Sequence, residues 1–272
     1  MTYKNLTIMS PVDSLSKKAG YDQLYGWFVY HEGIADKIPT IVYFHENDYF
    51  PPARLYMIEK LYKNPQKYNV VMVDYRGYGY SQGKPSEDGL YSDCRAIMDF
   101  VLRMQEIDQK QVYIFGASLG GVMATYSALH YQDHVNALIL QNTIASVRSI
   151  INDKAPILDP IVPLVLKLKM RSDERIKEIH LPIMFIVGLN DTSTGPHQME
   201  IMYNSAVNAK ERDLYNIPGC DHYLTWYYGG KEFDTRLTDF ISRNNPEAFG
   251  LYKVAQEVGK SFSTFGLSVK DW

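Results

Sequence analysis

The chain has 272 residues and a formal net charge of -3, with 28 basic side chains against 31 acidic ones. This balance offers no electrostatic case for binding nucleic acid or an anionic membrane surface. Its two cysteines, Cys94 and Cys220, are too few for a disulfide framework and lack metal-ligand spacing. We therefore expect one large α/β domain whose partners are small or neutral molecules.

The first residues lack the apolar core of a signal peptide, and no run of about 18 apolar residues occurs in the sequence. We expect a cytoplasmic protein, and nothing in the sequence indicates membrane association. The 22 tyrosines and 11 phenylalanines exceed what a core requires. Some of them are therefore expected to line a pocket or a surface.

Two segments near the N-terminus, residues 4–12 and 24–31, alternate apolar and polar side chains, which predicts antiparallel strands at a sheet edge. From residue 40 onward, continuous apolar runs alternate with helix-spaced segments. Such runs are typical of strands buried on both faces, and their alternation with helices predicts a parallel, doubly wound sheet. The expected buried strands cover residues 41–44, 70–73, 112–115, 137–140, 183–187 and 213–217, and the expected helices cover residues 53–63, 87–105, 120–131, 198–206 and 232–244.

Residues 145–180 depart from this rhythm, because their apolar side chains cluster between Pro156, Pro160 and Pro163. We interpret them as a short helical, cap-like insertion over the active site, and a plain excursion that covers the sheet remains open. The single domain is expected to span residues 1–249. The tail, residues 250–272, is too polar for a core of its own, so it packs on the domain or docks a protein partner.

The strand expected at 112–115 runs into a Gly-x-Ser-x-Gly pentapeptide centred on Ser118 and then into a helix-like segment. A serine on so tight a turn needs neighbours without side chains, and Gly116 and Gly120 meet that need. Ser118 is therefore a candidate nucleophile, and the backbone N–H of Leu119 points toward a developing oxyanion. The alternative is a serine that merely caps the helix.

A serine hydroxyl needs a base, and the base needs an acid that orients it. Asp191 follows the strand at 183–187, and His222 follows the strand at 213–217, so both belong to loops at the carboxyl edge of the sheet. The order Ser118, Asp191, His222 is the order that this class of sheet uses. Asp221 is the alternative acid, although an acid adjacent to the histidine rarely reaches its Nδ1.

The chain resembles the eukaryotic α/β-hydrolase-domain serine hydrolases, the branch that contains esterases and acyl-protein thioesterases. The resemblance covers roughly residues 24–244 and implies the α/β-hydrolase fold. The matching stretches are Val73-Asp74-Tyr75-Arg76-Gly77-Tyr78-Gly79-Tyr80-Ser81, Glu87-Asp88-Gly89-Leu90-Tyr91, Phe115-Gly116-Ala117-Ser118-Leu119-Gly120-Gly121, Gln141-Asn142-Thr143 and Gly188-Leu189-Asn190-Asp191.

Relatives usually carry His-Gly-Asn-x-Gly after the third strand, where this chain has His45-Glu46-Asn47-Asp48-Tyr49. The resemblance implies that the backbone N–H of Asn47 joins that of Leu119 in the oxyanion hole. A carboxylate facing a developing oxyanion would raise the barrier to the reaction. We hypothesise that Glu46 turns away and that activity survives, and His45 is a further candidate modulator.

These observations predict a serine hydrolase that cleaves carboxylic esters or thioesters through a triad and an acyl-enzyme intermediate. Such a mechanism requires no metal or organic cofactor. The choice of esters and thioesters depends on the resemblance alone. A scaffold that keeps the fold but has little or no activity is the alternative from the binding class. A serine peptidase or a lipase is the alternative among enzymes.

Overall fold

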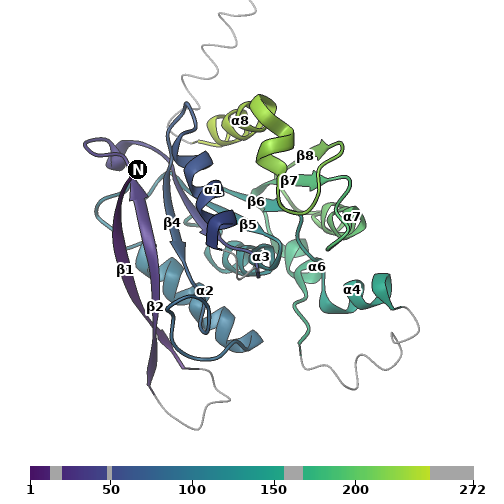
Figure 1. Cartoon of the computed structure of the whole chain (residues 1–272), viewed down its shortest axis with the longest axis horizontal. Coiled ribbons are helices and arrows are strands. Elements are labelled where there is room, and N and C mark those ends of the chain that lie inside the picture. Colours follow the sequence, from purple (N-terminus) through teal and green to yellow (C-terminus); the bar gives the residue numbers. More distant parts are fainter. Residues whose placement is uncertain (13–19, 48–50, 156–167, 246–272) are drawn as a thin grey trace, which may run out of the picture.

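The computed structural model describes residues 1–12, 20–47, 51–155 and 168–245. These residues form an eight-stranded sheet in the order β1-β2-β4-β3-β5-β6-β7-β8 (Figure 1). The strands are β1 (Thr2–Pro11), β2 (Tyr21–Tyr30), β3 (Thr40–Phe44), β4 (Asn69–Val73), β5 (Val112–Ala117), β6 (Ala137–Gln141), β7 (Pro182–Gly188) and β8 (Glu211–Ile217). The helices are α1 (Pro51–Tyr62), α2 (Glu87–Val101), α3 (Leu119–Tyr131), α4 (Val147–Lys154), α6 (Ser172–Arg175), α7 (Pro196–Ser205) and α8 (Thr225–Arg243), with short 3₁₀ turns η1 (Ala35–Lys37) and η3 (Ile176–Glu178).

The sheet confirms the doubly wound, mostly parallel architecture with an antiparallel N-terminal edge. Strand β1 pairs with β2 and β2 with β4 in antiparallel register, whereas β3 to β8 pair in parallel. The continuous apolar runs explain this difference, because every residue of β3 to β7 is buried while burial alternates along β1. The carboxyl ends of the parallel strands therefore meet at one edge of the sheet.

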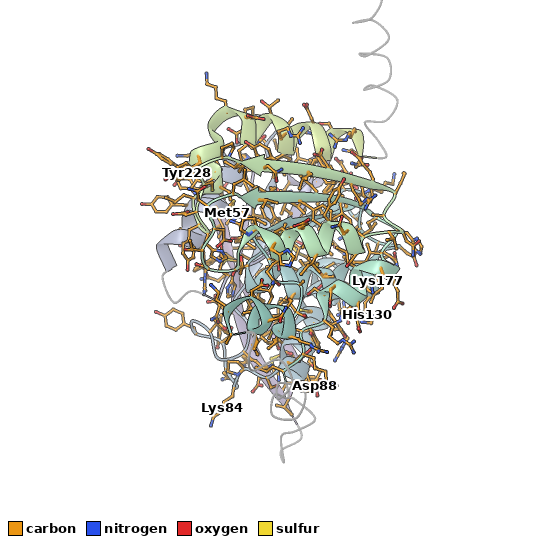
Figure 2. All side chains as sticks on the ribbon, turned by 90° about the vertical axis from the view of Figure 1, so that its right-hand side faces the viewer. Met57, Lys84, Asp88, His130, Lys177 and Tyr228 are labelled. Carbon is orange, nitrogen blue, oxygen red and sulfur yellow. The ribbon has the colours of Figure 1, made fainter. Side chains whose placement is uncertain are left out.

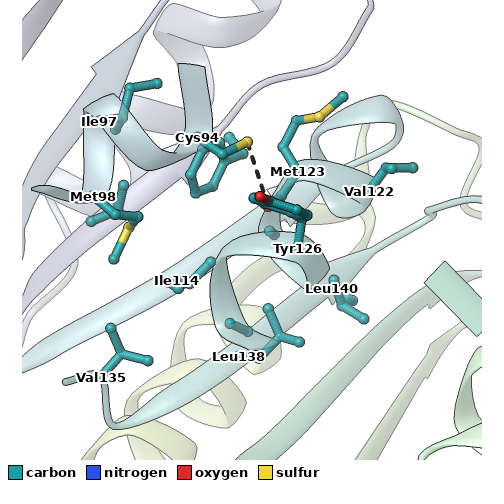
Figure 3. Close-up of a cluster of buried hydrophobic side chains, with 14 of the residues drawn as sticks. Cys94, Ile97, Met98, Ile114, Val122, Met123, Tyr126, Val135, Leu138 and Leu140 are labelled. Carbon is teal, nitrogen blue, oxygen red and sulfur yellow. Dashed lines mark hydrogen bonds between the residues drawn. The ribbon is translucent and has the colours of Figure 1, made fainter. Parts of the chain in front are cut away.

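The core consists of two apolar layers, one on each face of the sheet. Helices α2, α3 and α7 contribute to one layer, and α1 and α8 contribute to the other. Figure 3 shows part of the first layer, where Cys94 of α2 lies 3.8 Å from the carbonyl oxygen of Met123. Burial raises the pKa of the Cys94 thiol, so this cysteine remains protonated and serves as a packing residue.

Helix α8 begins earlier than its apolar spacing predicts, at Thr225 rather than at residue 232. Gly229 and Gly230 interrupt the periodicity, and the backbone of Gly230 has a φ of 53°, which kinks the helix. Helices α4 and α6 and the turn η3 lie within 145–180, but residues 156–167 are outside the described part of the chain. The tail at 250–272 is also outside it. The assignments of cap and tail therefore stay predictions.

Arg76 and Asp93 form an ion pair inside the protein, with exposed side-chain fractions of 1% and 0%. The Arg76 guanidinium donates to Asp93 at 2.7 Å and also to the hydroxyl of Ser10 and the carbonyl oxygen of Pro11, both at 2.9 Å. The pair therefore joins the loop after β4 to helix α2 and to the end of β1. This placement assigns Arg76 a structural role.

Removing one partner of this pair leaves the other charge buried without compensation, which costs about 3–5 kcal/mol in comparable proteins. We expect Asp93→Ala to lower the free energy of unfolding by about that amount, as measured by urea denaturation. The exposed helical pair of Lys63 with Glu59 is the control, and Glu59→Ala should change the same free energy by about 0.5 kcal/mol or less. A loss of less than about 1 kcal/mol in Asp93→Ala would contradict the structural role.

Candidate active site

Ser118 lies in the sharp turn between β5 and α3, with φ at 53° and ψ at -122°. A side chain strains the backbone at positive φ, so the surrounding structure must hold this turn. A Cβ on Gly116 would lie 2.4 Å from the Cβ of Ala124, and a Cβ on Gly120 would lie 1.9 Å from the carbonyl oxygen of Phe44. Both positions therefore require glycine, and Ser118 itself remains partly exposed.

The structure brings Ser118, His222 and Asp191 together, although they come from loops after three different strands. The Nε2 atom of His222 lies 2.9 Å from the Ser118 Oγ, and its Nδ1 atom lies 2.8 Å from an Asp191 carboxylate oxygen. An ionised carboxylate can only accept a hydrogen bond, which assigns the imidazole proton to Nδ1. The Nε2 atom is then free to accept the proton of the serine hydroxyl.

The Asp191 carboxylate is held by donors from its own loop. One oxygen accepts from the backbone N–H groups of Ser193 and Thr194, at 2.7 and 3.1 Å, and the other accepts from the Thr194 hydroxyl at 2.7 Å. Burial alone would raise the pKa of Asp191, but hydrogen bonds from His222 and Thr194 outweigh it and hold this pKa at about 2. Asp191 is therefore ionised at neutral pH.

Asp221, the alternative acid, has a different set of contacts. One of its carboxylate oxygens accepts from the backbone N–H groups of Tyr223 and Leu224, both at 3.0 Å. This pattern is typical of an aspartate that stabilises a turn. The geometry thus pairs His222 with Asp191, while Asp221 shapes the loop that carries the histidine.

The loop after β3 lies directly against the start of α3, because a Cβ on Gly120 would also lie 2.7 Å from the carbonyl oxygen of His45. That carbonyl accepts a hydrogen bond from the Tyr75 hydroxyl at 3.0 Å. The rings of His45 and Tyr75 stack with their centroids 4.1 Å apart. Burial and the positive charge of Arg54 lower the pKa of His45 to about 3, so its ring is neutral. Its Nδ1–H donates to the carbonyl oxygen of Glu46 at 2.7 Å, which stabilises the turn.

The two expected oxyanion donors, Leu119 and Asn47, lie at the ends of these adjoining segments. Leu119 is the first residue of α3, where backbone N–H groups have no partner within the helix. The side-chain oxygen of Asn47 accepts a hydrogen bond from the Tyr78 hydroxyl. Asp48 and Tyr49, the next residues of the motif, lie outside the described residues. Both assignments as oxyanion donors remain predictions.

The Glu46 side chain is buried, and one carboxyl oxygen accepts a hydrogen bond from the Tyr43 hydroxyl at 2.8 Å. Tyr43 belongs to the core layer under α1 and α8, so the Glu46 carboxyl is bonded toward that layer. Burial raises the pKa of Glu46, and hydrogen bonds from its own N–H and from Tyr43 counter this shift only in part. The raised pKa reduces the negative charge that Glu46 carries near Ser118.

Several exposed aromatic side chains follow His222 along the chain, in line with the expectation that some aromatics line a surface. The ring of Tyr223 packs edge-on against the imidazole with centroids 4.8 Å apart, and Trp226 of α8 stacks on Tyr56 of α1 at 5.9 Å. Tyr227 and Tyr228 are 66% and 49% exposed. Figure 2 shows Tyr228 at one side of the molecule. This aromatic surface adjoins the carboxyl edge of the sheet.

Sequence reasoning missed two contributors to the site, Thr194 and Asn142. Thr194 lies three residues after Asp191 and binds its carboxylate, yet a threonine at that spacing carries no distinctive signal. Asn142 belongs to a stretch that the resemblance matched without assigning it a role, and its amide contacts the loops of Asp191 and His222. The Thr194 contact depends on how its loop folds, and the Asn142 contacts depend on packing between loops.

Among the residues that the structure describes, no group of three or more His, Cys, Asp or Glu side chains is arranged to hold a metal ion. Cys220 is buried near the site, and burial raises the pKa of its thiol to about 12. Over the same described ranges, none of the helices is both long and apolar enough to cross a membrane.

A sequence model for the alpha/beta hydrolase fold matches residues 26–177. The chain is similar to the alpha/beta hydrolase domain-containing protein WAV2 of Arabidopsis thaliana, with 30% identity over 221 residues, which cover 77% of this chain and 71% of WAV2. It is also similar to Protein bem46 of Schizosaccharomyces pombe, with 30% identity over 208 residues that cover 76% of this chain and 68% of bem46.

Among solved structures, the chain resembles the esterase Pf2001 of Pyrococcus furiosus with a TM-score of 0.66 and 18% sequence identity. The superposition covers 90% of this chain and 91% of the esterase. At this identity the likeness establishes the fold alone. The known proteins and the sheet topology thus agree on the architecture that the sequence predicted.

Replacing Glu46 by glutamine tests whether its charge opposes the reaction. The amide keeps an acceptor for the Tyr43 hydroxyl and removes only the ionisable oxygen, so we expect kcat for a nitrophenyl ester to change by less than about threefold. A rise in kcat of about tenfold or more would show that the carboxylate does face the developing oxyanion. Circular dichroism and thermal unfolding of both proteins check that the fold is intact.

Replacing Thr194 by valine removes the hydroxyl that donates to Asp191, so the pKa of Asp191 should rise above about 2, as followed by NMR of the carboxyl carbon. The pKa of Asp191 is lower in the folded protein than in the unfolded chain, so its ionised carboxylate stabilises the fold. This stabilisation is complete above the unfolded pKa of about 3.9 and is lost as the pH falls toward about 2. The variant should therefore lose about 1 kcal/mol of unfolding free energy near neutral pH. An unchanged pKa would contradict the role of Thr194.

Proposed function

Because the chain belongs to the α/β-hydrolase family, we propose that it hydrolyses carboxylic esters or thioesters by acyl transfer to Ser118. The contacts of His222 are the observation that carries this proposal. One ring nitrogen lies 2.9 Å from the Ser118 hydroxyl while the other lies 2.8 Å from Asp191. A base in that position, with its tautomer set by a carboxylate, is what a serine nucleophile needs.

In the proposed reaction, His222 Nε2 takes the proton from the Ser118 hydroxyl as the oxygen attacks the substrate carbonyl carbon. The N–H groups of Leu119 and Asn47 stabilise the oxyanion that forms. His222 then returns the proton to the leaving alcohol or thiol, and the acyl group stays on Ser118. Water, deprotonated by His222, releases the carboxylic acid and restores the serine. Asp191 stabilises the charged imidazolium in both halves.

One observation favours an ester or thioester with an apolar part over a peptide. The surface beside His222 is aromatic, and residues 223–230 include no charged side chain, so it suits an uncharged substrate portion. Placement of the chain within the eukaryotic branch of esterases and acyl-protein thioesterases is part of the same proposal.

A fluorophosphonate probe, which reacts with an activated serine, tests the proposal directly. We expect the wild-type protein to be labelled and Ser118→Ala to be unlabelled, with kcat for a nitrophenyl ester reduced by about a millionfold. Ser242→Ala is the matched control, because the Ser242 hydroxyl bonds Gln66 and lies near the far end of α8. This variant should label as the wild type does.

Absence of labelling in the folded wild-type protein would overturn the proposal and favour a ligand-binding scaffold. If labelling occurs, a panel of acyl esters, acyl thioesters and peptides graded by chain length defines the substrate class. Turnover of peptides alone would contradict the assignment to esters and thioesters, and activity only on water-insoluble long-chain glycerides would favour a lipase.

A further inference from the structure

The end of strand β6 and the two residues after it, residues 141–143, contact the turn that carries Ser118. The Ser118 N–H donates to the carbonyl oxygen of Gln141 at 2.9 Å. The hydroxyl of Thr143 donates to the carbonyl oxygen of Ser118 at 2.7 Å. The segment 141–143 therefore binds both the backbone N–H and the carbonyl oxygen of Ser118. Its strand, β6, lies between β5 and β7 in the sheet.

Asn142, in the middle of this segment, joins the two loops that carry the base and the acid. Its Nδ2 donates to the carbonyl oxygen of His222 at 2.9 Å and to that of Asp221 at 3.2 Å. Its Oδ1 accepts from the backbone N–H of Gly188 at 2.8 Å, at the end of the strand that leads to Asp191. The amide thus uses both its donors and its acceptor in one bridge.

The backbone of Asn142 extends this bridge. Its N–H donates to the carbonyl oxygen of Ile186 at 3.1 Å, and its own carbonyl oxygen lies 3.1 Å from the Thr194 hydroxyl, which also contacts Asp191. The side chain is 1% exposed, and the backbone has a φ of 43°. Among residues with a side chain, asparagine and aspartate tolerate this conformation best.

We propose that Asn142 is a positioning residue, which sets the place of the His222 imidazole relative to Asp191 and Ser118. This inference rests on the proposed function, because a positioned base matters only if Ser118 reacts. The loop after β8 has no regular secondary structure at His222, and the Asn142 amide supplies hydrogen bonds to the carbonyl oxygens of Asp221 and His222 themselves. A displacement of about 1 Å at a catalytic base costs about a hundredfold in rate.

Two variants separate the amide from the backbone conformation. Asn142→Asp keeps the shape, the tolerance of positive φ and the acceptor for Gly188, but it loses both donors and places a carboxylate against two carbonyl oxygens. Asn142→Gly accepts the positive φ without strain and loses every side-chain bond. A defect that the two variants share therefore reports the loss of the Nδ2 donors.

We expect kcat for a nitrophenyl ester to fall at least about tenfold in both variants while KM stays within about twofold. The fluorophosphonate labelling rate should fall in parallel. The low-field proton NMR signal of the His222 Nδ1–H, which reports the bond to Asp191, should shift upfield or broaden. A purely structural role would change stability without changing kcat per folded molecule or this signal.

Asn69 provides a matched control, because its amide is also fully buried and its Nδ2 donates to the Ala35 carbonyl oxygen at 2.8 Å and to the Thr40 hydroxyl at 3.1 Å. It lies at the start of β4, at the edge of the sheet away from the site. Asn69→Asp should lower the thermal unfolding temperature as Asn142→Asp does. Its kcat per folded molecule and its His222 signal should match those of the wild type.

The inference is overturned if Asn142→Gly and Asn142→Asp keep wild-type kcat and an unchanged His222 signal, or if Asn69→Asp loses as much activity per folded molecule. These outcomes differ from a failure of the proposed function, in which wild-type protein neither hydrolyses esters nor reacts with the probe. The NMR signal requires no turnover, so it tests the positioning role in either case.

Discussion

The first turn of helix α3 lies so close to the segments after β3 and β6 that neither Gly120 nor Gly121 has room for a Cβ. A Cβ on Gly120 would lie 1.9 Å from the carbonyl oxygen of Phe44, and one on Gly121 would lie 2.0 Å from the Thr143 hydroxyl. The loops after β3 and β6 therefore cannot shift without moving the turn at Ser118. These two contacts hold the turn at Ser118, the β3 loop and the 141–143 segment at set positions relative to one another. A protein interior is so closely packed that a shift in one of these segments displaces the others.

Hydrogen bonds and burial together set the charge of the buried side chains at this edge. Donors keep Asp191 ionised against the cost of burial, whereas burial keeps His45 neutral. Glu46 is bonded to Tyr43, and burial raises the pKa of its carboxyl. Because the dielectric constant is low inside a protein, these local contacts decide which groups carry charge beside Ser118.

The sequence predicted the parallel sheet because continuous apolar runs leave little alternative to strands covered on both faces. It also predicted that Ser118, Asp191 and His222 would meet, since each follows its own strand and parallel strands end at the same edge. It did not predict where α8 begins, because Gly229 and Gly230 interrupt the helical periodicity and the kink they allow depends on packing. Thr194 was missed because its contact with Asp191 depends on how the loop folds.

The sequence by itself thus determined the family, the order of the strands along the chain and the residue types that could react. Only the tertiary structure decided which acid orients His222, where the Glu46 carboxyl points and how Asn142 joins two loops 46 and 80 residues away along the chain. The physical reason is that apolar periodicity and glycine positions are local properties of the chain. Hydrogen bonds between loops depend on angles and distances that exist only once the sheet has assembled.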